Sequence, residues 1–400
     1  MLSKCGRQLL RASSAWRLRC WRQLGGVRMP QECPVEMTHT SLVIEAEARR
    51  FIHDCLRRVG VPFEKLRSIS DFLLAADYRG VHGSGINRLE MYLRDLQQGY
   101  VDITAEPEII SETAATAHVD GNCAMGVFVG NYCMDLAVEK ARKLGIGFVV
   151  AKRSHHIGMA AWYAFRAMAK GYIGLVLSNA APMLMAPGAQ VASLGANCLA
   201  FGADATHSHF MLDMAVTMKE IGAVEWAYIK NELIPNTWAA DESGLPTCFP
   251  SLALRAQRLY PVGGHKGYCL AAMIDVLCGV MSGANYATRV PRWWSESQIG
   301  CNPNLGLVML ALDPCVFVPD FHERLDDFRR CIETSSPLDE AKPIRMAGQP
   351  EKQHMYYVDD LGALPFPNVL LAKFKRIADL LCVKPMELAF VSSNTQYRCM

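Results

Sequence analysis

A glycine-rich loop followed by an arginine is the first stretch of the chain whose residue types could do chemistry. Residues 76 to 92 read ADYRGVHGSGINRLEMY, in which Arg88 opens an amphipathic helix that runs through Tyr92. A guanidinium group is suited to bidentate recognition of a carboxylate. Such a loop should also offer a proton donor at its tip, but the residue there is Ser84, with His82 two positions upstream. The stretch therefore predicts a substrate loop whose donor is either unusual or lost.

Two interpretations of this donor remain open. A serine hydroxyl is a poor acid near neutral pH, whereas histidine titrates in that range. If residues 82 to 84 are extended, the side chains of His82 and Ser84 point to the same side, and His82 could relay a proton through Ser84 or water. The alternative is that His82 is a solvated loop residue and that the loop has lost its acid.

The stretch RSHHIGMAAWYA, residues 153 to 164, lies where a predicted strand gives way to a helix. The free N–H groups and the positive dipole end at such a junction could bind a phosphate. Gly158 would let the chain approach a ligand closely. Two adjacent histidines should not both face inward, so we expect either His155 or His156 to be exposed. The alternative is that the histidine here is a satisfied structural residue.

The stretch YPVGGHKGYCL contains a second candidate anion site, because the pair Gly263 and Gly264 gives a permissive turn before a long helix. His265 and Lys266 are expected to point from the start of this helix into a cleft. A lysine at a helix N-terminus is unfavourable with the helix dipole unless an anion lies there. The stretch therefore predicts a bound phosphate or carboxylate, and the alternative is a solvated loop lysine.

The composition restricts the class of protein. With 400 residues, one large or two interleaved domains are expected, and a net charge of +2 gives no reason to expect nucleic acid. The fifteen cysteines contain no CxxC spacing, which indicates a reducing compartment and no zinc ribbon. The longest apolar run, residues 267 to 284, is shorter than about 20 residues and contains Asp275, so we expect a buried helix and no membrane span. Neither a dinucleotide-binding nor a P-loop glycine motif is present, which argues against a Rossmann domain.

Hydrophobic periodicity predicts the elements that position these stretches. Residues 40 to 100 form a helical layer, and the helix–strand–helix–strand order from 131 to 180 predicts α/β layering. Within that order, the strands are expected at 146–152 and 173–180, and the helices at 131–145 and 159–171. Farther along the chain we expect a helix at 267–284, a strand at 305–313, helices at 319–333 and 367–384, a short strand at 344–348, and loops at 285–304 and 335–365.

The chain resembles the type-2 malate/L-lactate dehydrogenase (MDH/LDH-2) family from about residue 40 to 390. The resemblance is carried by ADYRGVHGSGINRLEMY, SHHIGMAAWYA, LSNAAPMLMAPG, SLGANCLAFGA, FMLDMAV, PVGGHKGYCLA and MAGQPE. It implies an α/β fold that is not Rossmann, with a helical N-terminal layer, a largely antiparallel sheet that binds NAD or NADP, and a homodimer. Residues 40–110 and 285–400 would form the helical, substrate-side domain, and 111–284 the cofactor-binding domain.

The resemblance also implies roles for individual residues. Arg88 would bind the carboxylate of a small substrate, and His156 would be catalytic or face the cofactor, while Ser84 and His82 stand where a donor is needed. No metal, nucleic acid or membrane partner is expected. The cofactor pocket would be formed by His156, Ile157, Gly158, Met159, Ala160, Ser178, Asn179, Asp213, Met214, Ala215, His265, Lys266, Gly348 and Gln349.

Several positions depart from the family pattern. The family's loop reads Ser-His-Gly where this chain reads GSG, so the donor histidine is Ser84 and the serine that orients it is Gly83. A substrate-contacting threonine becomes Ala196, and an acid that completes a relay in some members becomes Ala223. Loss of a proton donor typically lowers a rate by about 100- to 10,000-fold.

Two functions therefore remain open. The first is an NAD(P)-dependent oxidoreductase for a small 2-hydroxy or 2-oxo acid or a cyclic imino acid. The second is a catalytically impaired, cofactor-binding pseudoenzyme.

The first 31 residues have a different composition from the rest. They are rich in arginine, serine and leucine and contain no acid before Glu32, which is typical of a mitochondrial transit peptide. The alternatives are a disordered basic tail or translation that starts at Met29, which would leave the protein in the cytoplasm. The basic residues of this segment are Lys4, Arg7, Arg11, Arg17, Arg19, Arg22 and Arg28.

Overall fold

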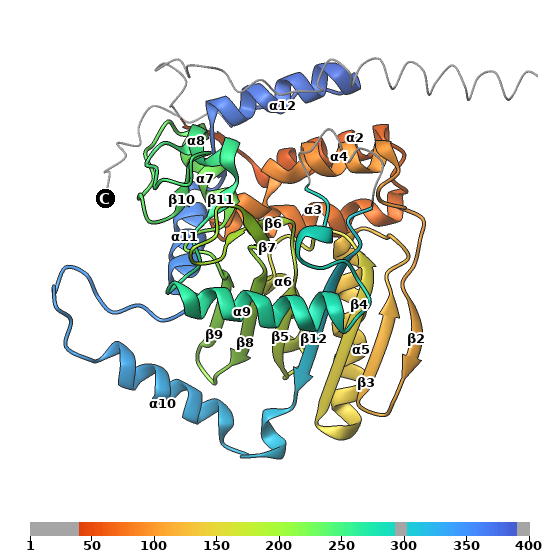
Figure 1. Ribbon diagram of the computed structural model, residues 1–400, viewed down its shortest axis with the longest axis vertical. Coiled ribbons are helices and arrows are strands. Elements are labelled where there is room, and N and C mark those ends of the chain that lie inside the picture. The colour runs from red at the N-terminus through yellow and green to blue at the C-terminus, as the bar shows by residue number, and fades with distance from the viewer. Residues whose placement is uncertain (1–39, 293–301, 390–400) are drawn as a thin grey trace, which may run out of the picture.

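A seven-stranded sheet runs through the middle of the molecule (Figure 1). The structure is a computed structural model that describes residues 40–292 and 302–389, so the predicted leader lies outside the described residues. Strand β3 pairs with β4 in parallel, and the other neighbours are antiparallel. This confirms the predicted α/β fold with a largely antiparallel sheet. The strands, in spatial order, are β2 (Glu108–Glu112), β3 (Thr116–Asp120), β4 (Ile146–Ser154), β12 (Leu305–Leu312), β5 (Ile173–Ser178), β8 (Cys198–Asp204) and β9 (His209–Ala215).

Both faces of this sheet are covered by helices, which explains why its central strands are almost continuously apolar. Helices α5 (Gly126–Leu144) and α6 (Ala161–Met168) pack on one face. Helix α9 (His265–Asp275) and the π-helical turn η4 (Val276–Val280) cross the other. In β12 the side chains of Leu307 and Met309 belong to the core under α5, whereas Val308 between them belongs to the core under α9. This alternation is the period of two expected of a strand.

A helical layer lies across one end of the sheet, as predicted (Figure 1). It contains α2 (Glu45–Arg58), α3 (Phe63–Tyr78), α4 (Leu89–Gln98) and α12 (Asn368–Leu381). The rings of Phe51 and Phe374 pack at 5.8 Å between centroids, which joins the first and last of these helices. The short strands β1 (Thr40–Val43) and β13 (Leu364–Pro367) pair antiparallel and tie the two ends of the described chain together. Between α3 and α4 the chain makes the 3-10 turns η2 (His82–Ser84) and η3 (Ile86–Arg88).

A smaller sheet lies beside the helical layer and carries helix α7 (Ile221–Ile229). Residues of α7, among them Val224 and Ala227, share a small core with the inner strands of this sheet. The sheet therefore holds α7 against the loop between α3 and α4, which it contacts through η2. The smaller sheet consists of β10 (Ala239–Ala240), β11 (Arg258–Leu259), β6 (Pro182–Met185) and β7 (Ala192–Gly195), with α8 (Pro250–Ala256) beside α7.

The structure corrects three of the predicted elements. The expected loop 335–365 contains α11 (Gln349–Leu361), and the expected strand 344–348 is instead irregular chain that leads into α11. Val358 is the buried residue of α11, so the helix lacks the apolar stripe by which it could have been found. The run 267–284 is a surface helix with one exposed apolar side, where Val276 is 53% and Val280 55% exposed. The predicted helix at 319–333 is α10 (Phe321–Glu333).

Two further observations bear on the organisation of the chain. The division into a domain of residues 40–110 and 285–400 and a domain of 111–284 stays a prediction. Strand β12, from the first group, is hydrogen bonded between β4 and β5 of the second. In the part of the chain that the structure describes, no helix has the length and apolar character needed to cross a membrane.

Candidate active site

A buried cluster of Arg88, Tyr92, His156 and Glu225 joins three parts of the fold. Arg88 ends η3 and Tyr92 follows one turn later on α4, so that both side chains lie on the same side of the helix start. His156 follows the end of β4, and its Nδ1 lies 2.8 Å from the Tyr92 hydroxyl. Glu225 comes from α7. The structure thus brings together the predicted substrate arginine and the predicted catalytic histidine, and we refer to these four residues as the Arg88 cluster.

The electrostatics of the cluster keep its histidine and tyrosine neutral. Burial, the positive charge of Arg88 and the neighbouring His155 together lower the pKa of His156 well below its ordinary value. Burial likewise raises the pKa of Tyr92 above its ordinary value. A neutral imidazole that donates its Nδ1–H to the Tyr92 phenol can accept a proton at Nε2, and the imidazolium formed can return that proton. The pair is therefore suited to general acid–base chemistry.

The guanidinium group of Arg88 is already engaged by a carboxylate of the same chain. Its Nη1 donates to Oε1 of Glu225 at 3.1 Å, and its Nη2 donates to Oε2 at 2.5 Å. Its Nε donates to the Gly83 carbonyl oxygen. Arg88 is only 7% exposed. The substrate-binding role of Arg88 stays a prediction, and the carboxylate that the guanidinium binds in the structure is that of Glu225.

Neither of the two interpretations of His82 agrees with the structure. Residues 82 to 84 form a 3-10 turn and are not extended, so His82 and Ser84 do not share a side as the relay required. His82 is also not a solvated loop residue. Its Nδ1 lies 3.1 Å from Oδ1 of the buried Asp77, and its ring stacks on Trp226 with 4.2 Å between centroids. Asp77 shapes the loop as well, because its other carboxylate oxygen accepts the Ile86 N–H at 2.7 Å.

The prediction that one of the two adjacent histidines is exposed is wrong. His155 is fully buried, with its Nε2 3.1 Å from Oδ2 of Asp95, and His156 is partly buried. Both can face inward because β4 ends at Ser154 and the chain then leaves the strand alternation. Helix α4 supplies a partner for each, Asp95 for His155 and Tyr92 for His156.

The residues after His156 pack inside the protein. Ile157, Met159 and Ala160 are at most 3% exposed and belong to the main hydrophobic core. Gly158 has φ +59°, and a Cβ there would lie 2.1 Å from the ring of Phe72. The sequence suggested that Gly158 allows a close approach to a ligand. In the structure the residue that lies close to it is Phe72 of the core. The cofactor role of residues 157 to 160 stays a prediction.

The start of α6, where the sequence predicted free N–H groups for a phosphate, is capped by a side chain. Oδ2 of Asp213, near the end of β9, accepts the Ala161 N–H at 2.9 Å. A carboxylate therefore already occupies the positive end of this helix. Desolvation raises the pKa of Asp213 to about 7, with smaller contributions from neighbouring acids. Met214 and Ala215 follow it to the end of β9 and are partly exposed.

This pKa predicts a specific dependence of stability on pH. Because the folded pKa of Asp213 lies above its ordinary value near 4, the folded state binds more protons than the unfolded state from about pH 4 to 7. The free energy of unfolding should therefore fall as the pH rises through this window. Asp213→Asn keeps an oxygen to accept the Ala161 N–H but removes the charge. We expect it to raise the melting temperature at pH 8 by roughly 2 °C or more, without cofactor, and to have little effect at pH 4.5.

Differential scanning fluorimetry at a series of pH values checks this prediction. The matched control is Asp326→Asn, because Asp326 accepts hydrogen bonds from Ser208 and His207 and these lower its pKa. That variant should be less stable than the unmodified protein by a similar amount at pH 4.5 and at pH 8, because the lowered pKa of Asp326 places its titration below this window. Equal effects of Asp213→Asn at both pH values would contradict the raised pKa of this carboxyl.

Four other predicted cofactor residues have internal hydrogen bonds. Ser178 ends β5, and its hydroxyl donates to the Gly306 carbonyl at 3.2 Å. The Oδ1 of Asn179 accepts the Gly306 N–H, and its Nδ2 donates to the Asn285 carbonyl oxygen. Gly348 is the N-cap of α11 with φ +87°. The Gln349 side chain accepts the Met346 N–H and donates to Glu333.

The sheet places several predicted cofactor residues at one edge. Ser178 pairs with Cys198 and Cys198 with Ala215, while Ser154, just before the histidines, pairs with Leu305 at the start of β12. The C-terminal ends of β4, β5 and β9 therefore meet at the same edge, the one that faces the helical layer (Figure 1). His156, Asn179 and Asp213 are brought to this edge by chain segments far apart in sequence.

His265 and Lys266 are exposed at the N-terminus of α9 and do not point into a cleft as predicted. The turn before them contains Gly263 and Gly264, with φ of +60° and +64°. The Nε2 of His265 lies 3.4 Å from the thiol of Cys269.

The sequence reasoning did not single out Tyr92, Glu225, Asp77 or Trp226 as functional residues. Tyr92 could have been found, since it lies four residues after Arg88 on a predicted helix. Glu225 gave no signal, because only the tertiary packing of α7 brings it to Arg88. Two positions were predicted to depart from the family pattern. Ala196 lies between β7 and β8, and Ala223 follows Gly222 in α7.

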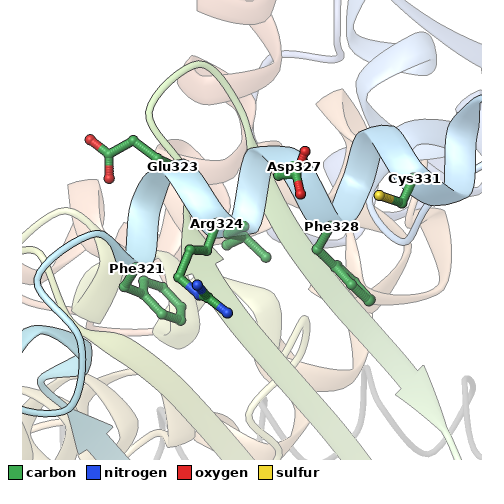
Figure 2. Close-up of a pocket in the computed structure, with 7 residues that line it drawn as sticks. Phe321, Glu323, Arg324, Asp327, Phe328 and Cys331 are labelled. Carbon is green, nitrogen blue, oxygen red and sulfur yellow. The ribbon is translucent and has the colours of Figure 1, made fainter.

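A surface hollow of about 720 Å³ lies elsewhere, along α10. Figure 2 shows Phe321, Arg324 and Phe328 projecting from one side of this helix and Glu323 from the other. In Figure 1, α10 lies at the end of the sheet opposite to the helical layer that carries Arg88. The hollow is therefore separate from the Arg88 cluster.

Comparison with known proteins identifies the family to which this non-Rossmann fold belongs. Residues 43–375 match the family described as malate/L-lactate dehydrogenase, and the chain belongs to that family. This membership confirms the predicted class, an oxidoreductase of the dehydrogenase type, and supports NAD or NADP as its cofactor.

Three similar proteins illustrate the match. A malate dehydrogenase from Pyrococcus horikoshii is 32% identical over 306 residues, which cover 75% of this chain and 84% of that protein. A ureidoglycolate dehydrogenase (NAD(+)) from Escherichia coli K12 is 31% identical over 307 residues, 75% of this chain and 85% of that protein. The crystal structure of a malate dehydrogenase from Entamoeba histolytica superposes with a TM-score of 0.80 at 28% identity, covering 86% of this chain and 99% of that one.

Proposed function

We propose that this protein transfers a hydride between NAD or NADP and a small 2-hydroxy or 2-oxo acid, or a cyclic imino acid. The observation that carries the proposal is the Arg88 cluster, which joins a buried guanidinium to the hydrogen-bonded pair of His156 and Tyr92. The guanidinium suits a carboxylate, and the neutral pair suits proton transfer beside it. The relatives named malate and ureidoglycolate dehydrogenase support the same class of substrate.

The tautomers of His156 assign a role to each ring nitrogen. When bound, the reduced cofactor supplies a hydride to the substrate carbon that bears the oxygen or nitrogen. In reduction the donor is the imidazolium form of His156, whose Nε2–H gives its proton to that oxygen or nitrogen and leaves a neutral imidazole hydrogen bonded to Tyr92 through Nδ1. In oxidation a neutral imidazole, with its proton on Nδ1 and donated to Tyr92, accepts the substrate proton at Nε2 and becomes the imidazolium. His156 therefore takes the donor role that Ser84 cannot fill.

The start of α9 fits a phosphate of the cofactor. No side chain caps this N-terminus, and a Cβ at Gly263 or Gly264 would meet no atom within 4 Å, so the backbone there is open. Lys266 adds a positive charge to the positive end of the helix dipole, an arrangement that favours an anion. His265 and Lys266 would hold the phosphate, while the edge of the sheet near Asn179 and Asp213 would hold the remainder of the molecule.

The exposed apolar side of α9 and η4 supports a homodimer, which we also propose. Met273 of α9 is 48% exposed and Val280 of η4 is 55% exposed, although both side chains are apolar. A contiguous apolar stripe of this kind is typical of a protein–protein interface. Sedimentation velocity of the full chain tests the proposal, and a single monomeric species at micromolar concentration would reject it.

A mitochondrial location is proposed on the composition of the first 31 residues, which contain seven basic residues and no acid. Import of a fluorescent protein fused to these residues tests this proposal. A fusion that remains in the cytoplasm would reject it.

A second function is favoured by specific observations. Arg88 already holds Glu225, and Ser84 replaces the donor of the family's loop. A cofactor-binding protein that no longer turns over substrate would show both features. This alternative differs from the first in its turnover alone, because both require cofactor binding.

Absorbance of NADH and NADPH, followed against a panel of 2-oxo acids and cyclic imino acids, separates the two functions. The full chain and a form that lacks residues 1–31 should oxidise cofactor with at least one substrate. Ser84→His restores the family's loop acid and is expected to raise kcat by about 10-fold or more, within the range of general acid catalysis. Cofactor binding without turnover in either protein would support the non-catalytic function.

A further inference from the structure

The ion pair between Arg88 and Glu225 has the geometry of carboxylate recognition. Both terminal nitrogens of Arg88 donate to the two carboxylate oxygens of Glu225, one to each. This fork-to-fork arrangement is the one in which arginine binds carboxylate ligands. The side chains are 8% and 18% exposed, so solvent does little to weaken the pair. A substrate carboxylate that used the same two nitrogens would have to displace Glu225.

The loss of a side chain at position 83 allows this pair to form. A Cβ at Gly83 would lie 2.8 Å from the Cα of Gly222, and a Cβ at Gly222 would lie 2.4 Å from the Cα of Gly83. The loop and the first turn of α7 are therefore in backbone contact. Any larger residue at position 83 would push α7 away from the loop and Glu225 away from Arg88.

Further contacts hold α7 in this position. Gly222, Glu225 and Trp226 are spaced three and four residues apart, so they lie on one side of the helix. The ring of Trp226 stacks on that of His82, and the Nδ1 of His82 is hydrogen bonded to Oδ1 of Asp77. The closed arrangement thus depends on residues of both the loop and α7 and is not a chance contact of one long side chain.

We infer that Glu225 is a specificity-determining residue that competes, on Arg88, with the carboxylate of the substrate. The inference rests on the proposed role of Arg88. Two carboxylates cannot both occupy the fork of one guanidinium, and bringing them together in a buried site is unfavourable. Glu225 therefore lowers the affinity of the site for simple 2-oxo acids and selects ligands that can displace it.

Binding of oxamate, a stable analogue of 2-oxo acids, tests the inference without any need for turnover. Isothermal titration calorimetry is carried out on the full chain, with and without NADH. Glu225→Gln keeps the size of the side chain and removes its charge. We expect it to bind oxamate roughly 10- to 100-fold more tightly than the unmodified protein, as for one hydrogen-bonded charge released from competition. Glu232→Gln is the matched control, since Glu232 pairs with Lys230 at the surface, and it should bind oxamate as the unmodified protein does.

A second variant tests the same inference from the loop. Gly83→Ser cannot keep the backbone contact with Gly222, so it should also tighten oxamate binding. The double variant Arg88→Met, Glu225→Gln should lose the gain. Unchanged or weaker binding by folded Glu225→Gln would overturn the inference, as would a gain that persists without Arg88.

The outcomes also separate this inference from the proposed function. Tighter oxamate binding by Glu225→Gln with no turnover in any variant would keep the inference and reject the dehydrogenase activity. Turnover of 2-oxo acids with the same KM in the unmodified protein and in Glu225→Gln would do the reverse.

Discussion

Replacing His156 by asparagine is expected to lower kcat for the reduction of a 2-oxo acid by about 100- to 10,000-fold, the range typical of a lost general acid. We propose the ring nitrogen of His156 that faces away from Tyr92 as the proton donor, and asparagine cannot carry that proton. Cofactor affinity, measured by the quenching of protein fluorescence, should change little. Steady-state absorbance of NADH or NADPH measures the rate.

Two control variants show whether the loss is chemical. Tyr92→Phe removes the hydroxyl that lies 2.8 Å from Nδ1 but leaves the imidazole, so a smaller loss, about 10-fold, is expected. His82→Asn alters a histidine that is bound to Asp77 and Trp226, and it should retain most of the activity. If His82→Asn abolished turnover while His156→Asn did not, the donor would be His82 and the assignment to His156 would be wrong.

Replacing Arg88 by methionine is expected to lower kcat/KM for carboxylate substrates by about 100- to 1,000-fold, as for the loss of one buried partner of a charged pair. The same change leaves Glu225 partly buried without its partner, so the melting temperature should fall as well. Differential scanning fluorimetry and steady-state kinetics on one preparation measure both effects.

The double variant Arg88→Met, Glu225→Gln separates the two consequences. It removes the unpaired charge, so the melting temperature should recover toward that of the unmodified protein. Activity should not recover, because no guanidinium remains for the substrate. Recovery of both together would mean that Arg88 has a structural role only.

Three strands of the main sheet could be predicted because each is marked by the composition of one short stretch of sequence. The stretches 146–152, 173–180 and 305–313 are short and almost continuously apolar, which indicates strands buried on both faces. They form β4, β5 and β12, three neighbours in the sheet. Helix α11 could not be predicted in the same way, because its one buried residue, Val358, leaves no hydrophobic periodicity.

The site could be predicted in part, for a similar reason. Arg88 and His156 belong to motifs that the family resemblance supplies, and the structure brings both into one cluster. The extended conformation that the His82 relay required is not present, since residues 82 to 84 form a 3-10 turn and the side chain of Asp77 accepts the Ile86 N–H. Glu225 lies 137 residues from Arg88 in the sequence. Its contact depends on backbone packing at Gly83 and Gly222, which no single stretch reveals.

Transfer of deuterium is the most direct test of the central claim that this chain catalyses hydride transfer at the Arg88 cluster. The full-length protein is incubated with NADH or NADPH deuterated on either face of nicotinamide C4 and with a panel of 2-oxo acids, and the products are analysed by mass spectrometry. We predict a 2-hydroxy acid that carries one deuterium from one face of the cofactor, formed far more slowly by His156→Asn. Bound cofactor with no deuterium in any product would contradict the claim.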